Sequence, residues 1–247
     1  MRQGFLIPIY RHGKTAIIIA QRLESFNLPV ILVDDGNDSE TRTLLAEYAA
    51  HSAHTVLISL KKNMGKGGAV IAGIEKASEL GLSHVLQTDA DGQHDIERAA
   101  FFLEESAQHP DNIICGFPEF DENAPKSRVR GRKISNFWAA ITTLSSEMKD
   151  MHCGFRVYPV EQTLRITRRR TMEKRMGFDT EILVRLYWNR VFPLYYPIKI
   201  NYPENGISNF HIVGDNIRVS WTFCRLCIGM FIRLPRLIAM QYRRRMV

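Results

Sequence analysis

Short apolar segments alternate with helical segments up to residue 116, and most of the apolar segments end in a polar motif. Continuous apolar runs of this length indicate buried strands, and apolar residues spaced by three and four indicate helices. Strands that alternate with longer helices form βαβ units, in which the strands run parallel. The pattern predicts strands at 4–10, 29–33, 55–60, 83–86 and 112–116, and helices at 14–26, 39–50, 69–77 and 96–108. We therefore expect an α/β fold with a mixed, mostly parallel sheet flanked by helices. Ser39 is the expected cap of the second helix.

Polar motifs follow several of these strands at the point where each strand ends. Ligands of open parallel sheets bind in the crevice outside the carboxyl ends of the strands. One crevice is therefore expected to collect Pro8, Tyr10, Asp34, Asp35, Asn63, Lys66, Asp89, Ala90 and Asp91. This convergence is the strongest functional signal in the sequence.

Two carboxylates, Asp89 and Asp91, come after the strand predicted at 83–86. Their spacing puts both on one side of an extended chain, so they can converge on one ion. Gly92 permits a sharp turn after the pair, and Gln93 adds a neutral oxygen. Such oxygens suit Mg²⁺ or Mn²⁺, which keeps positions open for water and substrate phosphates. An Asp-x-Asp pair alone also fits an acidic turn that only solvates a strand end, but the neighbouring motifs favour the metal site.

Several other function classes are disfavoured. The loop at 63–68 lacks the Gly-x-x-x-x-Gly-Lys-Ser/Thr spacing of a Walker A motif, and no Gly-x-Gly-x-x-Gly follows the first strand. The four cysteines are too scattered for a disulfide framework, so a reducing cytosol is the default compartment. No recognised nucleic-acid motif accompanies the basic residues, so we expect no nucleic-acid partner.

Four motifs together resemble the family 2 glycosyltransferases, and within them the dolichyl- or polyprenyl-phosphate sugar synthases. They are Ile-Pro-Ile-Tyr at 7–10, Val-Asp-Asp-Gly-Asn-Asp-Ser-Glu-Thr at 33–41, Asn-Met-Gly-Lys-Gly-Gly-Ala at 63–69 and Asp-Ala-Asp-Gly-Gln-His at 89–94. The resemblance covers about two-thirds of the chain. The sequence departs from it at residues 11–12, where Arg-His stands in place of the usual Asn-Glu.

The resemblance implies a GT-A fold and an inverting transfer from a nucleoside-diphosphate sugar. It places Asp35 and Asp34 toward the base and ribose of the donor. It directs Asp89, Asp91 and Gln93 toward the metal and the diphosphate. The second half of the chain is expected to serve the acceptor.

Arginines dominate the expected acceptor side. Arg128, Arg130 and Arg132 lie in a segment predicted as a basic loop at 124–134, followed by a helix to about residue 144. Their guanidinium groups match phosphate oxygens of the donor or the acceptor, although a solvated loop explains any single one of them equally well. The Gly-Phe-Arg segment that contains Arg156 resembles the acceptor border of the family, and Ser208 lies in a loop that resembles a family loop near a phosphate.

Asp179 is the expected general base, with Glu181 as the second choice, because the resemblance places a carboxylate near the reacting centre. Transfer to a hydroxyl requires a base that takes the acceptor proton. A lipid phosphate is already an anion and requires none. In that case Asp179 only positions groups or acts as an acid at a helix N-terminus.

The C-terminal segment 215–247 is predicted as a basic, amphipathic helical tail attached to a catalytic domain at 1–214. Seven arginines and no acidic residue follow residue 215, whereas the rest of the chain balances at 26 basic and 26 acidic residues. Arg225 and Arg233 interrupt the apolar run, so the uncharged stretch between them is too short to span a bilayer. We expect two helices, broken at Pro235, that lie on the membrane surface. Helices docked on the catalytic domain are the alternative.

Taken together, these patterns predict a metal-dependent, inverting sugar transferase on the cytoplasmic face of a membrane. Its partners would be a nucleoside-diphosphate sugar and a lipid-linked acceptor. The alternative function is a non-catalytic, nucleotide-binding membrane adaptor with a degenerate site, which the Arg-His pair at 11–12 favours.

Overall fold

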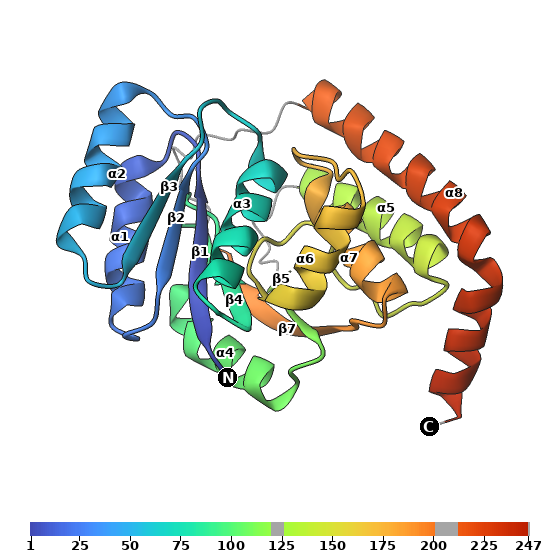
Figure 1. Cartoon of the computed structure of the whole chain (residues 1–247). Coiled ribbons are helices and arrows are strands. Elements are labelled where there is room, and N and C mark those ends of the chain that lie inside the picture. The colour runs from blue at the N-terminus through green and yellow to red at the C-terminus, as the bar shows by residue number, and fades with distance from the viewer. Residues whose placement is uncertain (120–125, 201–211, 247) are drawn as a thin grey trace.

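The computed structural model describes residues 1–119, 126–200 and 212–246. In these ranges seven strands form one sheet in the order β3-β2-β1-β4-β6-β5-β7 (Figure 1). They are β1 (Gln3–Ile9), β2 (Val30–Asp34), β3 (Thr55–Ser59), β4 (His84–Gln87), β5 (Ile113–Glu119), β6 (Arg156–Pro159) and β7 (Pro193–Lys199). Only β6 of the described strands runs antiparallel to its neighbours, β4 and β5. The expected mixed, mostly parallel sheet is confirmed.

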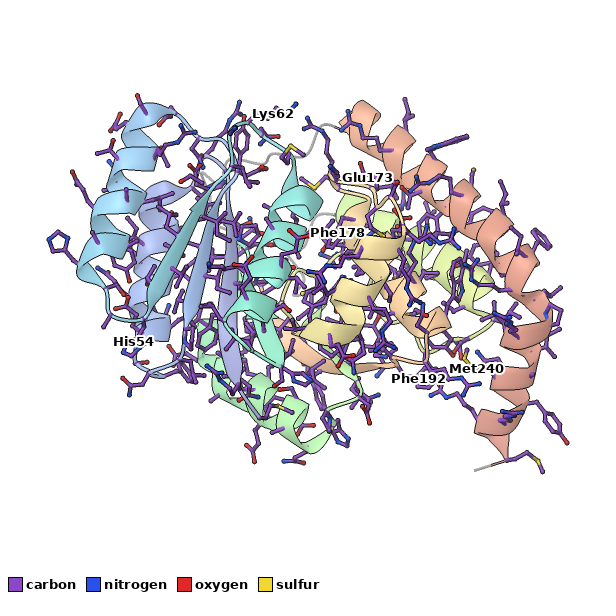
Figure 2. All side chains as sticks on the ribbon, viewed as in Figure 1. His54, Lys62, Glu173, Phe178, Phe192 and Met240 are labelled. Atoms are coloured by element: carbon purple, nitrogen blue, oxygen red, sulfur yellow. The ribbon has the colours of Figure 1, made fainter. Side chains whose placement is uncertain are left out.

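Helices cover both faces of the sheet. One face carries α1 (Gly13–Glu24), α2 (Ser39–His51) and α4 (Ala99–Gln108), which follows a short 3₁₀ turn, η1 (Ile96–Arg98). The other face carries α3 (Lys66–Glu79), α6 (Val160–Arg169) and α7 (Phe178–Trp188), with α5 (Lys126–Thr143) and α8 (Ile212–Arg245) packed outside α7. Figure 1 shows α8 as the outermost helix of this layer. Phe178 and Met240, both labelled in Figure 2, belong to its core.

Strand β1 shows how the sequence builds the two cores. Because successive side chains of a strand point to opposite faces, Phe5, Ile7 and Ile9 join the core under α1 and α4, whereas Leu6 joins the core under α3. Helix α3 lies close to the strand at Gly73, where an added Cβ would be 2.1 Å from the Leu6 side chain. The parallel strands are therefore apolar on both faces, as expected for a sheet covered on both sides.

Several local predictions are wrong. The cap of α2 is Asp38, whose carboxylate accepts a hydrogen bond from the Thr41 amide, and Ser39 is the first helical residue. The basic segment expected as a loop forms the first half of α5. Strand β6 and helix α6 were not anticipated, since a four-residue strand leaves little periodicity to recognise.

The C-terminal segment is one continuous helix, not two helices broken at Pro235. Leu226 and Met230 before the proline and Leu237 and Met240 after it are all buried in the same core. Burial on both sides offsets the hydrogen bond that proline removes, so the helix continues. Along the described part of the chain, no helix combines the length and apolar character needed to cross a bilayer. The domain boundary at residue 214 stays a prediction.

Ion pairs to the buried carboxylate of Glu181 connect α8 to α7. The carboxylate of Glu181 is fully buried and accepts hydrogen bonds from Arg185 of α7 at 2.6 and 2.9 Å. It also accepts one from Arg225 of α8 at 2.8 Å and one from the Glu173 amide at 2.8 Å. Glu173 in turn accepts from the amides of two residues before α7. One carboxylate therefore joins α7, α8 and the loop between α6 and α7.

Replacing Glu181 by leucine is expected to lower the free energy of unfolding by about 3 kcal/mol, because two partly buried guanidinium groups lose their common counter-ion. Urea denaturation followed by circular dichroism measures the change. Glu161→Leu is the matched control, since Glu161 pairs with Arg165 at the same i,i+4 spacing but its side chain is 81% exposed. Its effect is expected to stay within about 0.5 kcal/mol. Equal losses in the two variants would contradict the cluster's structural importance.

Candidate functional site

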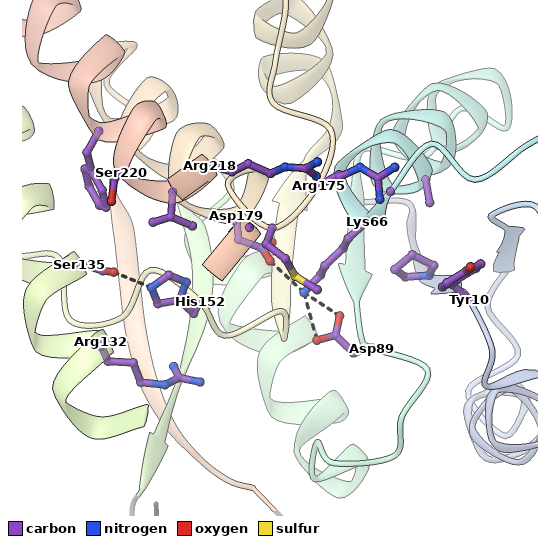
Figure 3. A pocket seen from close by; sticks show the side chains of 18 of the residues that line it. Tyr10, Lys66, Asp89, Arg132, Ser135, His152, Arg175, Asp179, Arg218 and Ser220 are labelled. Atoms are coloured by element: carbon purple, nitrogen blue, oxygen red, sulfur yellow. Dashed lines mark hydrogen bonds and ion pairs between the residues drawn. The ribbon is translucent and has the colours of Figure 1, made fainter. Parts of the chain in front are cut away.

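One large cavity of 1780 Å³ lies at the carboxyl ends of β1, β2 and β4, and α3, α5, α7 and α8 complete its walls (Figure 3). Most of the polar residues that were predicted to share one crevice line this cavity. The predicted residues that line it are Pro8, Tyr10, Asp35, Asn63, Lys66, Asp89, Ala90, Asp91, Gln93, Arg130, Arg132 and Asp179. The cavity also extends between α5 and α8, where its lining includes the apolar side chains of Trp138, Phe223 and Ile228.

Lys66 lies at the centre of this constellation. Its Nζ is 2.9 Å from Oδ1 of Asp89 and 2.9 Å from Oδ2 of Asp179, as Figure 3 shows. Burial alone would lower the pKa of Lys66, but the two carboxylates raise it above its ordinary value. Burial likewise opposes ionisation of Asp89, yet Lys66 and His94 bring the pKa of Asp89 below its usual value. The three side chains are therefore held as one cation between two anions.

The antiparallel strand β6 makes this arrangement possible. Because β6 runs against β4 and pairs Gln87 with Arg156, its first residues lie beside the end of β4. Gly154, just before β6, packs against the ion pair. A Cβ there would lie 2.6 Å from both Asp89 carboxylate oxygens and 2.7 Å from Lys66 Nζ. The glycine of the Gly-Phe-Arg segment therefore lets the backbone lie directly against the Lys66–Asp89 ion pair.

Asp35 forms the other polar wall of the cavity. Its Oδ1 accepts a hydrogen bond from the Met64 amide at 2.6 Å, and its Oδ2 accepts one from Asn63 Nδ2 at 3.1 Å. Burial raises the pKa of Asp35 above its ordinary value, although the Met64 hydrogen bond opposes that change. Gly36 follows with a φ of +69° and touches the backbone of residues 62–63, which holds the two loops together.

The loop after β4 carries the predicted metal ligands. The Asp91 carboxylate accepts a hydrogen bond from the Gln93 amide at 3.0 Å, and both residues line the cavity with Asp89. Among the residues that the structure describes, no group of three or more His, Cys, Asp or Glu side chains has the arrangement of a metal site. The donor set of two carboxylates and one amide fits Mg²⁺ or Mn²⁺, which commonly takes one or two carboxylates and fills its other positions with water and substrate phosphates.

Three predicted site residues do not line the cavity. Asp34 is fully buried and accepts from the Asn37 amide and side chain and from Arg42. Glu181 is buried in the ionic cluster between α7 and α8. Arg156 is fully buried beneath Asp179, where Nη1 donates to the Asp179 carbonyl at 2.9 Å and lies 3.7 Å from Oδ1 of its carboxylate.

Two further predicted residues cannot be placed by side chain. Ser208 lies outside the described residues. Arg128 is in the first turn of α5, but its side chain is outside the part that the structure describes. Arg132, from the same helix, lines the cavity and forms an ion pair with Asp150.

Residues that the sequence did not single out also line the cavity. Arg175, from the loop before α7, and Arg218, from α8, extend across its upper side in Figure 3. His152 lies 2.7 Å from the Ser135 hydroxyl, and burial lowers the pKa of His152 to about 4, so the imidazole is neutral at pH 7. Arg175 belongs to a segment at 168–175 that is rich in basic residues, where no pattern distinguishes one arginine from its neighbours.

Known proteins are similar to this chain in sequence and in fold. Residues 7–177 match the family described as glycosyl transferase family 2. A dolichyl-phosphate beta-glucosyltransferase of Dictyostelium discoideum is 32% identical over 64% of this chain, and the match spans half of that relative's length. A UDP-N-acetylglucosamine–dolichyl-phosphate N-acetylglucosaminyltransferase of Methanococcus voltae is 24% identical over 87% of this chain and 90% of the relative.

Among solved structures, the glucosyl-3-phosphoglycerate synthase of Mycobacterium tuberculosis in complex with UDP superposes with a TM-score of 0.71 at 11% identity. The superposition covers 92% of this chain and 80% of that one, and it establishes the likeness of fold. The family match covers more than half of the chain and includes Asp35, Asp89 and Asp91 of the cavity, whereas Asp179 and the lining residues of α8 lie beyond it. The chain belongs to glycosyl transferase family 2 and has the mixed α/β sheet of its GT-A fold.

Proposed function

We propose that this protein transfers a sugar, with inversion, from a nucleoside-diphosphate sugar to a phosphate-terminated lipid acceptor, and that Mg²⁺ or Mn²⁺ assists. The observation that carries the proposal is the cavity in which Lys66 joins a loop of acidic donor-side residues to Asp179 on the opposite wall. The names of the Dictyostelium and Methanococcus relatives support a lipid-phosphate acceptor. A solved complex of the mycobacterial neighbour with Mn²⁺ and UDP-glucose supports the donor class and the metal.

On the donor side, Asp35 and Asn63 are the residues we assign to the base and ribose. Both present hydrogen-bonding groups from loops that hold each other in place. Asp89, Asp91 and Gln93 would hold the metal ion. When bound, the ion neutralises the negative charge that develops on the departing diphosphate. Pro8, Tyr10 and Ala90 shape the wall around the donor.

On the acceptor side, the surroundings of Asp179 favour an acceptor that is already an anion. Lys66 lies 2.9 Å from one Asp179 oxygen and Arg156 lies 3.7 Å from the other. A carboxylate between two cations serves to position them rather than to take a proton. We therefore assign Asp179 to orienting Lys66, and a phosphate acceptor removes the need for a base.

In the transfer step, an oxygen of the acceptor phosphate attacks the anomeric carbon on the face opposite the leaving group. The bond between that carbon and the diphosphate oxygen breaks, and its electron pair stays on the diphosphate. Arg132, which Asp150 holds in place, and Arg218 are cations near the acceptor side of the cavity. Their guanidinium groups would bind the acceptor phosphate and hold its oxygen in line.

The acceptor's lipid chain is assigned to the apolar part of the cavity between α5 and α8. In this proposal the protein is peripheral, on the cytoplasmic face of a membrane, and the tail from residue 215 contacts that membrane. The apolar lining by Trp138, Phe223 and Ile228 supports this assignment.

Metal-dependent transfer from one UDP- or GDP-sugar is expected when purified protein is incubated with Mn²⁺ or Mg²⁺ and a membrane extract. Asp91→Ala is expected to lower transfer at least about a hundredfold, because charge stabilisation at the leaving group is lost. A chelator should abolish transfer in the wild type. Asp111→Ala, at an exposed carboxylate before β5, is the control and should keep full activity. Absence of both turnover and metal-dependent nucleotide binding would contradict the proposal and leave the adaptor function.

Gly154→Ala is expected to lower kcat/KM about tenfold or more, because the added methyl group displaces the Asp89 carboxylate or the Lys66 ammonium. Steady-state transfer assays measure the loss, and thermal unfolding shows whether the fold survives. Gly131→Ala is the matched control, since Gly131 also lines the cavity but a Cβ there meets no atom within 4 Å. Wild-type activity in Gly154→Ala would show that the close approach does not matter.

A further inference from the structure

Helix α8 has an apolar stripe on its solvent side, in addition to the apolar face that packs on the protein. Ile217, Trp221, Ile228 and Ile232 recur at separations of four, seven and four residues, so they share one side of the helix. Trp221 is 65% exposed and Ile232 is 76% exposed. The exposed set continues with Phe231, Ile238 and Tyr242. The buried set consists of Phe223, Leu226, Met230, Leu237 and Met240, on the opposite side of the helix.

Helix α5, which packs against α8, adds a second exposed apolar group. Phe137 and Trp138 follow Ile134 by three and four residues, and all three side chains are exposed. Ile134 and Trp138 of α5 and Ile228 of α8 also line the cavity. These three exposed residues of the two helices therefore border the same cavity. We call Ile134, Phe137, Trp138, Ile217, Trp221, Ile228, Phe231, Ile232, Ile238 and Tyr242 the α5–α8 apolar face.

The charges of the two helices indicate what covers this face. The sequence of α5 contains five Lys and Arg and no acidic residue, and after residue 215 α8 contains seven Arg and no acidic residue. Arg218, Arg225, Arg236 and Arg243 recur at separations of seven, eleven and seven residues, so they form one row beside the apolar stripe. Within this row, Arg218 also lines the cavity and Arg225 also binds Glu181. An apolar stripe bordered by arginines complements a bilayer with anionic headgroups.

We propose that the α5–α8 apolar face lies in the headgroup region of an anionic bilayer, with the mouth of the cavity against the membrane. The sequence predicted the tail alone as the membrane contact, whereas this surface combines two helices and is continuous with the site. A phosphate headgroup then enters the cavity, and its lipid chain runs along the apolar residues between α5 and α8 to the bilayer. This last consequence rests on the proposed function, but binding to lipid does not depend on it.

Vesicle flotation tests the proposal with the full chain and no sugar donor present. The probes are vesicles of phosphatidylcholine alone and of phosphatidylcholine mixed with phosphatidylglycerol. Wild-type protein is expected to bind the mixed vesicles at least about tenfold more tightly, because several arginines approach anionic headgroups. Trp221→Gln/Ile232→Gln is expected to weaken that binding about tenfold or more, since two apolar side chains no longer enter the interface.

Matched variants separate lipid contact from general effects. Ile232→Gln and Ile18→Gln both replace an exposed isoleucine of a helix, but Ile18 lies on α1, away from the apolar face. The proposal requires weaker binding only in the first. Neither Trp221 nor Ile232 lines the cavity, so sugar transfer to a water-soluble phosphate acceptor should be unchanged in the double variant.

Three results would overturn the proposal. Wild-type protein that floats with neither vesicle has no lipid-binding face, whatever its activity in the donor panel. Equal loss of binding in Ile232→Gln and Ile18→Gln would exclude this surface as the contact. A wild-type dimer that Trp221→Gln/Ile232→Gln disperses, together with absent vesicle binding, would assign the face to a second copy of the chain. Loss of sugar transfer with intact flotation would instead count against the proposed function alone.

Discussion

The ammonium group of Lys66, held between the carboxylates of Asp89 and Asp179, is the contact on which the site depends. It joins the first residue of α3, the loop after β4 and the first turn of α7. Without this cation, two carboxylates would face the same cavity with less compensation for their burial. The antiparallel strand β6 brings Gly154 against the pair, where no side chain fits. The position of β6 next to β4 in the sheet therefore places Gly154 against the Lys66–Asp89 ion pair.

The same helix that presents Asp179 also fixes the outer helix α8. Glu181, two residues further along α7, accepts hydrogen bonds from Arg225 of α8 and from the amide of Glu173. The loop that follows Glu173 carries Arg175 into the cavity. Helix α8 in turn places Arg218 at the cavity and its exposed apolar stripe toward solvent. The acceptor side and the proposed membrane surface are thus parts of one packed unit.

Sequence patterns predicted the mostly parallel sheet because β1, β2 and β4 are apolar runs that each end in a distinct polar motif. They also placed Asp35, Asp89 and Asp91 in one cavity, since carboxyl ends of parallel strands meet at one edge. Spacing along the chain does not reveal burial, so Glu181 remained the second candidate after Asp179 although only Asp179 lines the cavity. Arg175 and the short strand β6 were missed because long-range packing, which no local pattern records, gives them their places.

A double-mutant cycle on Lys66 and Asp179 tests the central claim most directly. Lys66→Met, Asp179→Asn and the combined variant would be compared by kcat/KM for sugar transfer with the donor that the wild type uses. If Lys66 and Asp179 act as one unit, the double variant should be little worse than the poorer single variant, with a coupling energy above about 1 kcal/mol. Effects that add to within about 0.5 kcal/mol would contradict the claim, because independent residues behave in that way.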